Sequence, residues 1–515
     1  MAFIKVTRRR ILRAALILVV GAVLFIALGG PIVARILSSK LKSKLEAANV
    51  HIGSLSVNLF TRSISIKDIN WDEKATVRSA YATGIRLLPF LRHNRISIHT
   101  LVLDGGVLDL IRDSIKFEKR KDSTNLKLSG IDADRITVSD IAVTIKHDTV
   151  TEYKGTLGVV LHFVALDTMA GYRNPSAYVL KNLEVTVKDL RIHYAGGLYV
   201  LRTKQIDFNK ELKQLNIDSL TLDPVASKVN WGSLVKDQNT RTELMITKLN
   251  AVGVTMGVHV KDTAVMATSV TMDGWYIHCY KNKKYRFNRK ERFPLPMESF
   301  RSIRLAIEVD TIKLRDGTII YEELPNEGFH NAQIKFDDVQ AQMNSVSNRS
   351  YENYPPYSTI HASGRVMKSG LVKAVFKVPL EPNKKYSAEG SIANLPLKEL
   401  NPLLKDIAFV QVSSGRMDKL SFQFRYDDEG SQGQVHFDYE DLRILSLNKD
   451  AEQDVNVFKT MLVNIAVKND KTLDGVIDVK RFKRKAVFHL WTMSLLDGIR
   501  SAIIPKIGEK KKKAK

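Results

Sequence analysis

From residue 50 onward, apolar residues alternate with polar ones, change phase, and then alternate again. In "SISIKDINW" (63–71), Ile64 and Ile66 alternate with polar residues, and Ile69 and Trp71 resume on the other parity. Alternation at period two places one apolar and one polar face on a β-strand. The change of parity means that one extra residue stands between the two apolar pairs. This residue would turn the later side chains to the wrong face unless the backbone compensates. A β-bulge or sharp bend at Lys67-Asp68 would keep all four apolar residues on one face.

The same signature recurs along the chain and predicts a series of similarly bent strands. Seven more copies have these residues between their apolar pairs: His99-Thr100, Ser139-Asp140, Lys188-Asp189, Asp218-Ser219, Asp273-Gly274, Asp337-Asp338 and Glu440-Asp441. Bent strands laid side by side make a curved sheet, a trough rather than a plane. The alternative is an ordinary antiparallel β-sandwich in which each phase slip marks a turn. The alternation alone leaves both open.

The strand patterns fall into two regions, followed by a segment of different character. The first region covers residues 50–345, and the second covers 355–480, after "NRSYENYPPYS". In the last segment, 481–515, apolar residues fall at helical spacing and a lysine run follows. This spacing predicts an amphipathic helix that either lies at a membrane surface or packs as a lid on the end of the sheet. The apolar residues are Phe488, Trp491, Leu495, Ile499 and Ile503.

The N-terminal part of the chain predicts a single membrane span. Residues 14–34 carry no charge, and a helix of that length spans roughly 30 Å at about 1.5 Å per residue. A signal peptide is disfavoured because its apolar region is usually only about 7–15 residues long. The basic tail, 1–13, is expected to stay cytoplasmic. Residues 35–49 are expected to form a juxtamembrane helix, and the rest of the chain lies beyond the membrane.

The formal charge of +24, from 79 Lys and Arg against 55 Asp and Glu, suits a protein that lies against an anionic membrane. Nucleic-acid binding is disfavoured because no nucleic-acid motif accompanies the charge. The basic run "KNKKYRFNRKER" (281–292) is interpreted as a solvated loop. The candidates for contact with the membrane surface are Arg35, Lys40, Lys42, Trp491, Lys510, Lys511, Lys512 and Lys513.

The sequence offers no motif of an enzyme, a metal site or a cofactor site. None of the twelve histidines lies in an H-E-x-x-H spacing, and the chain has neither a G-x-S-x-G elbow nor a G-x-x-x-x-G-K-[ST] phosphate loop. Its single cysteine, Cys279, cannot form an intrachain disulfide. His278 lies beside it, but adjacent strand residues point to opposite faces and cannot readily form a nucleophile–base pair. We expect no enzymatic activity, no cofactor and no metal.

The layout of the chain resembles the AsmA-like family of Gram-negative envelope proteins, which is similar to the chorein-type bridge-like lipid transfer proteins. The resemblance rests on the N-terminal apolar segment, on "VHIGSLSVNLFTRSISIKDINW" and "GIRLLPFLRHNRISIHTLVLDGGVLDL", and on a late stretch that begins "IANLPLKELNPLLKDIAFVQVSSGRMDKL". It implies a mostly β fold: a transmembrane helix, then a long curled antiparallel sheet with an open apolar groove, then the C-terminal amphipathic helix. It also implies a single-pass bacterial inner-membrane protein with a cytoplasmic N-terminus and a periplasmic body.

The resemblance further implies passive phospholipid transport between the inner and outer membranes along the groove. The expected partners are phospholipids, the inner membrane and an outer-membrane or envelope protein. The alternative function is a non-transporting β-rich envelope scaffold that assists outer-membrane protein assembly. Candidates to line the groove are Leu55, Val57, Leu59, Ile64, Ile66, Ile136, Val138, Val185, Val187, Leu215 and Ile217. A closed apolar core would use the same residues.

Overall fold

The computed structural model describes residues 50–58, 61–71, 75–86, 89, 95–111, 130–147, 150–167, 178–259, 262–287, 292–349, 354–381, 384–450, 453, 455 and 471–503. The predicted transmembrane helix (14–34), the juxtamembrane helix (35–49) and the lysine-rich tail lie outside these residues. So do the candidates Leu59, Arg35, Lys40, Lys42 and Lys510 to Lys513. Within the described residues, no helix is both long and apolar enough to cross a membrane.

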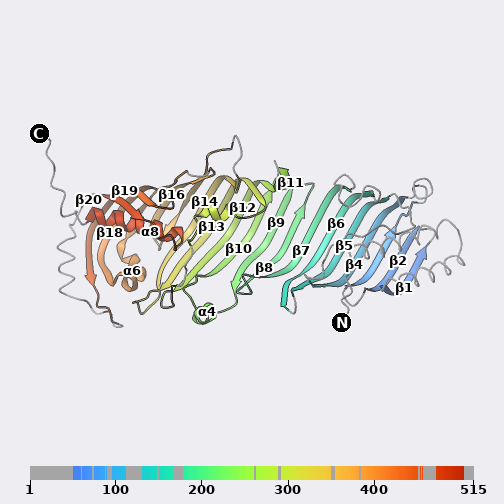
Figure 1. Cartoon of the computed structure of the whole chain (residues 1–515), viewed down its shortest axis with the longest axis horizontal. Helices are drawn as coiled ribbons and strands as arrows, with labels where there is room; N and C mark the ends of the chain where they lie inside the picture. The colour runs from blue at the N-terminus through green and yellow to red at the C-terminus, as the bar shows by residue number, and fades with distance from the viewer. Residues whose placement is uncertain are drawn as a thin grey trace. The chain divides into compact units, whose positions relative to one another are not determined.

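The described part of the chain is mostly β, with twenty strands in an antiparallel-rich sheet (Figure 1). Contacts divide the chain into two compact units, and the boundary falls between Leu220 and Thr221, inside strand β9. The first unit holds β1 (Val50–Asn58), β2 (Ser63–Trp71), β3 (Ala75–Thr83), β4 (Arg95–Ile111), β5 (Gly130–His147), β6 (Val150–Asp167), β7 (Tyr178–Tyr194), β8 (Tyr199–Asn209) and the start of β9 (Gln214–Pro224).

The second unit continues the strand pattern and adds short helices. Its strands are β10 (Arg241–Val252), β11 (Thr255–His259), β12 (Asp262–Asn282), β13 (Ala306–Leu324), β14 (Ala332–Ser347), β15 (Tyr357–Val366), β16 (Gly370–Pro379), β17 (Tyr386–Pro396), β18 (Val410–Tyr426), β19 (Gly430–Ser446) and β20 (Lys471–Lys480). Its helices are α4 (Lys228–Val235), α5 (Pro296–Arg301), η3 (Leu397–Leu400), α6 (Asn401–Ala408) and α8 (Val487–Ile503).

Two strand pairs depart from the predicted antiparallel sheet. The β4–β5 and β12–β13 pairs are parallel, whereas the other pairs with an assigned register are antiparallel. Parallel neighbours need a longer crossover than a hairpin turn supplies. The connections 112–129 and 283–305 have the necessary length, so the prediction of a purely antiparallel sheet was wrong at these two places.

The predicted bends are present as single residues in the left-handed region. In seven of the eight copies of the signature, the second of the two intervening residues has a positive φ: Asp68, Asp140, Asp189, Ser219, Gly274, Asp338 and Asp441. Six of these seven are not glycine, and aspartate tolerates this conformation better than most residues do. In β4, the left-handed residues are Gly105 and Gly106, and neither His99 nor Thr100 has a positive φ.

The register shows where the bends lie relative to the neighbouring strands of the first unit. The β1–β2 register passes from Ile52–Ile69 directly to Ser54–Lys67, so Asp68 falls opposite Gly53. In β5, pairing jumps from Val138 to Ile141 where Asp140 is inserted. Gly105 of β4 lies opposite Asp140 of β5, whereas Asp189 of β7 lies opposite Gly155 of β6, three residues from the position opposite Asp140. The bends therefore line up across some neighbouring strands and are offset across others.

The main apolar core described lies in the second unit. It includes the large buried side chains Leu395, Leu420, Tyr426, Tyr439 and Ile477, each no more than 2% exposed. Strands β16 to β20 supply most of this core, and helix α8 covers it. Such burial is the dominant stabilising contribution in a domain of this kind.

Asp189 in β7 offers a test of the bend geometry, because it has φ 52° and its side chain is exposed. We expect Asp189→Val to lower the free energy of unfolding by about 1–2 kcal/mol, since a β-branched residue clashes with its own backbone in this region. Asp189→Gly, the matched control, should leave the free energy unchanged or raise it. Urea unfolding followed by circular dichroism measures both. Equal values for the two variants would contradict a left-handed bend at this position.

Candidate functional site

Apolar residues form unbroken cross-strand rows over the first unit. One row, on one side of the bends, joins Leu55, Ile66, Ala80, Leu103, Val138, Val159, Val185 and Phe208, one residue from each of β1 to β8. A second row, separated from the first by Asp68 in β2, Gly105 in β4 and Asp140 in β5, joins Ile52, Ile69, Val77, Gly106, Ile141, Leu157, Val187 and Ile206. The left-handed residues keep both rows on the same face.

The burial of this face changes along the sheet. Near β1 to β3 it is well buried, with Ile64 at 5% and Ile66 at 3% exposed. From β5 to β8 most row residues are half-buried, among them Val138, Val159 and Val185, whereas Ile141 is 8% exposed. Side chains that only touch their neighbours within a sheet remain half-exposed in this way, because full burial requires a second layer.

Most of the predicted groove residues fall in these rows. Leu55, Ile66, Val138, Val185 and Val187 are members of the two rows. A third row joins Val57, Ile64, Ala82, Leu101, Ile136, Leu161 and Leu183. Leu215 and Ile217 lie two residues apart in β9, so they share one face of that strand, and both are half-buried.

Sequence reasoning missed the contributions of β3, β6 and β8. Ala80, Val159, Leu161, Ile206 and Phe208 complete the rows but were not candidates. The alternation in "TLGVVLHFVAL" contains the signal, but Val159-Val160 and Phe163-Val164 place apolar residues on both parities. The register decides between them: Val159 lies opposite Val138, whereas Val160 lies opposite Thr137 on the other face.

In the second unit, helix α8 covers the corresponding apolar face of strands β16 to β20. Val487, Leu490 and Ser494 of α8 are buried, and the Ser494 hydroxyl lies 2.6 Å from that of Ser431 in β19. Gly498 packs so closely on Val435 that a Cβ would lie 2.6 Å from a Val435 methyl group. The sequence left open whether this helix lies at a membrane surface or packs as a lid on the sheet. The inner face of the helix packs on the sheet, as the lid interpretation expects.

The aromatic residues of α8 take different places. The Trp491 ring stacks on Phe376 at 5.0 Å between centroids, so this membrane-surface candidate packs against the sheet. Phe488 is 68% exposed and Leu496 is 51% exposed, on the side of the helix away from the core. Burial and nearby lysines lower the pKa of His489 to about 4, so this side chain is neutral at pH 7.

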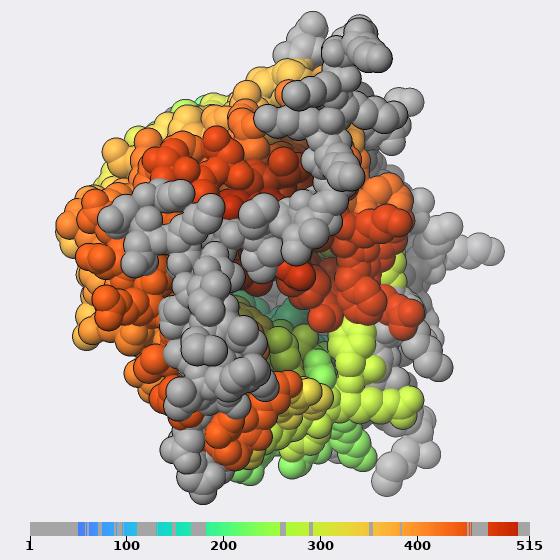
Figure 2. All heavy atoms as spheres, turned by 90° about the vertical axis from the view of Figure 1, so that its left-hand side faces the viewer, coloured from blue at the N-terminus to red at the C-terminus, as the bar shows by residue number. Residues whose placement is uncertain are grey.

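Helix α8 also occupies the edge of β20. The Ser501 hydroxyl accepts a hydrogen bond from the Val476 N–H at 2.7 Å and donates to the Val476 carbonyl at 3.0 Å. The Asp497 carboxylate accepts from the Asp478 N–H at 3.0 Å. Side chains that occupy the backbone groups of an edge strand protect it from pairing with another strand. Figure 2 shows a hollow at this end of the second unit, bordered by its orange and red C-terminal residues.

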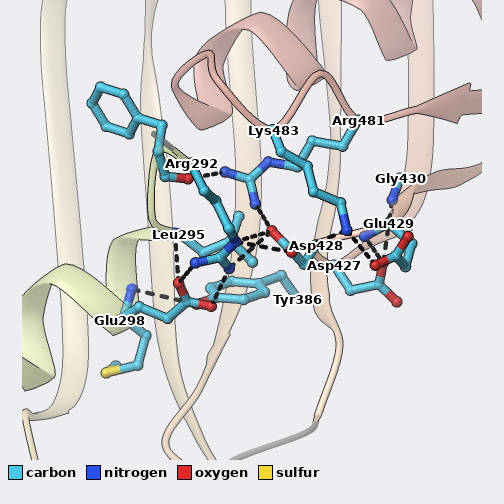
Figure 3. A network of polar contacts seen from close by, with 12 residues as sticks. Arg292, Leu295, Glu298, Tyr386, Asp427, Asp428, Glu429, Gly430, Arg481 and Lys483 are labelled. Atoms are coloured by element: carbon cyan, nitrogen blue, oxygen red, sulfur yellow. Dashed lines mark hydrogen bonds and ion pairs between the residues drawn. The ribbon is translucent and has the colours of Figure 1, made fainter. Parts of the chain in front are cut away.

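A polar network holds the segment that leads into α8 (Figure 3). The Arg481 side chain is 1% exposed; it donates to the Phe293 carbonyl at 2.5 Å and pairs with Asp428. Arg292 donates to Asp428 at 2.9 Å and to Glu298 at 2.7 and 2.8 Å. The network therefore ties the start of α8 to the β18–β19 turn and to the segment before α5. Burial opposes ionisation of Asp428, but hydrogen bonds and charges from the arginines outweigh it and lower the pKa of this carboxyl.

The described residues hold no metal-binding cluster and no activated thiol. No group of three or more His, Cys, Asp or Glu in the described part of the chain could hold a metal ion. Burial raises the pKa of the Cys279 thiol, whose sulfur lies 3.9 Å from the Thr242 hydroxyl. The Nε2 atom of His278 lies 2.8 Å from a carboxylate oxygen of Glu322, so the His278 ring points to Glu322 and not to Cys279. A raised thiol pKa is typical of a structural cysteine.

Asp428 links the network to the stability of α8. Because the pKa of Asp428 is lower in the folded protein, its carboxylate stabilises the fold fully at pH values above the unfolded-state pKa, about 3.9. This stabilisation is lost as the pH falls through the folded-state pKa. We expect Asp428→Asn to cost about 2 kcal/mol at pH 7 and to speed amide exchange in residues 487–503. The difference between variant and parent in urea unfolding should shrink below pH 4.

Glu429→Gln is the matched control, because Glu429 is 81% exposed and pairs only with Lys483 in this network. Its unfolding free energy should stay within about 0.5 kcal/mol of the parent. A cost for Asp428→Asn that persisted unchanged at pH 2 would contradict the role of the charge.

Comparison with protein-family models finds no model that matches the chain, and comparison with curated protein sequences finds no similar sequence.

Proposed function

We propose that the apolar face of the first unit binds the acyl chains of phospholipids and lets them pass along the sheet. The observation that carries this proposal is the continuity of the rows: each of the strands β1 to β8 contributes an apolar residue or glycine at every step. A continuous face offers a chain of equivalent contacts, so a lipid could move from strand to strand without crossing a polar barrier.

The energetics suit an extended apolar ligand. Each methylene kept from water contributes about 0.8 kcal/mol, and the half-buried side chains around Val138, Val159 and Val185 leave apolar surface to meet it. Charged side chains of the same strands lie on the opposite face, as the alternation requires. Phospholipid head groups would stay in water while only the acyl chains touch the sheet.

Transport between an inner and an outer membrane would be passive on this hypothesis. The resemblance to AsmA-like proteins supports a periplasmic body that is anchored in the inner membrane and serves outer-membrane lipid homeostasis. The sequence contains no phosphate-loop motif, so a lipid gradient or a partner protein would supply direction.

Charge on the apolar face should block lipid binding. We expect Val138→Asp to reduce phospholipid retained by the purified protein at least tenfold, because a carboxylate amid acyl chains must be desolvated or neutralised. Native mass spectrometry measures retained lipid, and transfer of a fluorescent phospholipid between donor and acceptor vesicles measures passage.

Thr137→Asp is the matched control, one residue away on the opposite face. It should retain lipid and transfer like the parent, with both variants checked for fold by circular dichroism. Equal transfer by Val138→Asp and the parent would show that these rows do not form the path. Absence of phospholipid from the parent would instead favour a non-transporting scaffold.

A further inference from the structure

Several basic side chains of the second unit converge on the segment that leads into helix α8. The Lys485 ammonium lies 3.3 Å from the Nε2 atom of His489, and both side chains are half-buried. Lys283, which follows β12 directly, lies close enough for its charge to act on both groups. This lysine of the basic run at 281–292 is itself half-buried, so it does not lie in the solvated loop that the sequence predicts.

Aromatic rings hold the cluster together. The centroid of the Phe482 ring lies 6.1 Å from that of Phe287 and 6.5 Å from that of His489. The charged groups of Lys485 and Arg484 lie 5.4 and 5.9 Å from the centroid of the Phe482 ring. Both distances are within the range of a cation–π interaction, about 6 Å. Two cations therefore share one ring, which keeps them close together although their charges repel.

The acidic side chain of the cluster is already occupied. Glu323 of β13 is 2% exposed; it accepts a hydrogen bond from the Tyr321 hydroxyl at 2.5 Å and pairs with the Lys283 ammonium at 2.6 Å. In the described part of the chain, no carboxylate forms an ion pair with Lys485. Burial and the charge of Lys283 lower the pKa of the Lys485 ammonium. The cluster therefore holds positive charge that its own side chains compensate only in part.

The excess of donors selects the chemistry of a ligand. Lysine and arginine side chains carry hydrogen-bond donors and no acceptors, so the ligand must be an anion. A phosphate group presents acceptor oxygens in several directions, and donors from separate segments can reach it together. We propose that Lys283, Arg484 and Lys485 form a binding site for a phosphate group, with His489 as a further hydrogen-bonding side chain. The site lies in the second unit and does not rest on the lipid path proposed for the first.

Lysine footprinting tests the site directly. The full chain, in dodecyl maltoside and phosphate-free buffer at constant ionic strength, is acetylated briefly, and the acetylation of each lysine is measured by mass spectrometry. The probes are inorganic phosphate and dihexanoyl phosphatidylglycerol below its micelle concentration. We expect a probe to slow acetylation of Lys485 by about threefold or more, because a bound anion engages the ammonium. Lys377, an exposed lysine of β16, should react as before.

The two probes distinguish the sources of the phosphate group. Half-protection of Lys485 by the lipid at a concentration roughly tenfold below that of inorganic phosphate, a difference of about 1.4 kcal/mol, would assign the site to a lipid head group. Protection by inorganic phosphate at an equal or lower concentration would assign it to free phosphate. Dihexanoylglycerol, which lacks the phosphate group, should give no protection.

A matched pair of variants separates the site from general charge attraction. Arg484→Gln removes an exposed cation of the site, whereas Arg425→Gln removes an exposed cation of β18. We expect Arg484→Gln to raise the half-protection concentration about tenfold and Arg425→Gln to leave it unchanged, with both folds checked by circular dichroism. Absence of protection of Lys485 by both probes would overturn the proposal. So would equal protection of Lys377, or an equal effect of the two variants.

Discussion

The structure depends on one backbone device, a residue in the left-handed region placed where the strand pattern changes phase. Without it, Ile69 would lie on the face opposite Ile64 and Ile66, and the apolar rows would break within β2. Asp68, Asp140 and Asp189 supply it in separate strands. Insertions of this kind bend the strand that carries them while its apolar residues stay on one face.

The two units use their apolar faces differently. In the second unit, α8 covers the face and caps the edge of β20, and the polar network around Asp428 and Arg481 holds the helix start in place. In the described part of the first unit, most row residues from β5 to β8 stay half-buried, so stability there depends on backbone pairing and cross-strand contacts more than on a sealed core. An apolar face that stays half-exposed to water over many strands is unfavourable in free energy unless a ligand covers it.

The sequence predicted the strands and most of the bends, and most of the predicted groove residues fall in the rows, because each follows from local alternation. It did not predict the parallel β4–β5 and β12–β13 pairs, since pairing direction depends on connections that carry no period of their own. It missed Val159, because apolar residues on both parities hide the face until the register is known. Trp491, a candidate for the membrane surface, packs on Phe376, and its helical spacing fits this packing equally well.

The central claim is that acyl chains touch the rows and not the opposite face. The most direct measurement is photo-crosslinking with benzoylphenylalanine placed singly at Val138, Val159, Leu161 and Val185, and at Thr137, Val160 and Thr186 on the other face, in the full chain in its native membrane. The account predicts phospholipid adducts, detected by mass spectrometry, at all four row positions and at none of the others. Adducts on both faces, or none at the row positions, would contradict it.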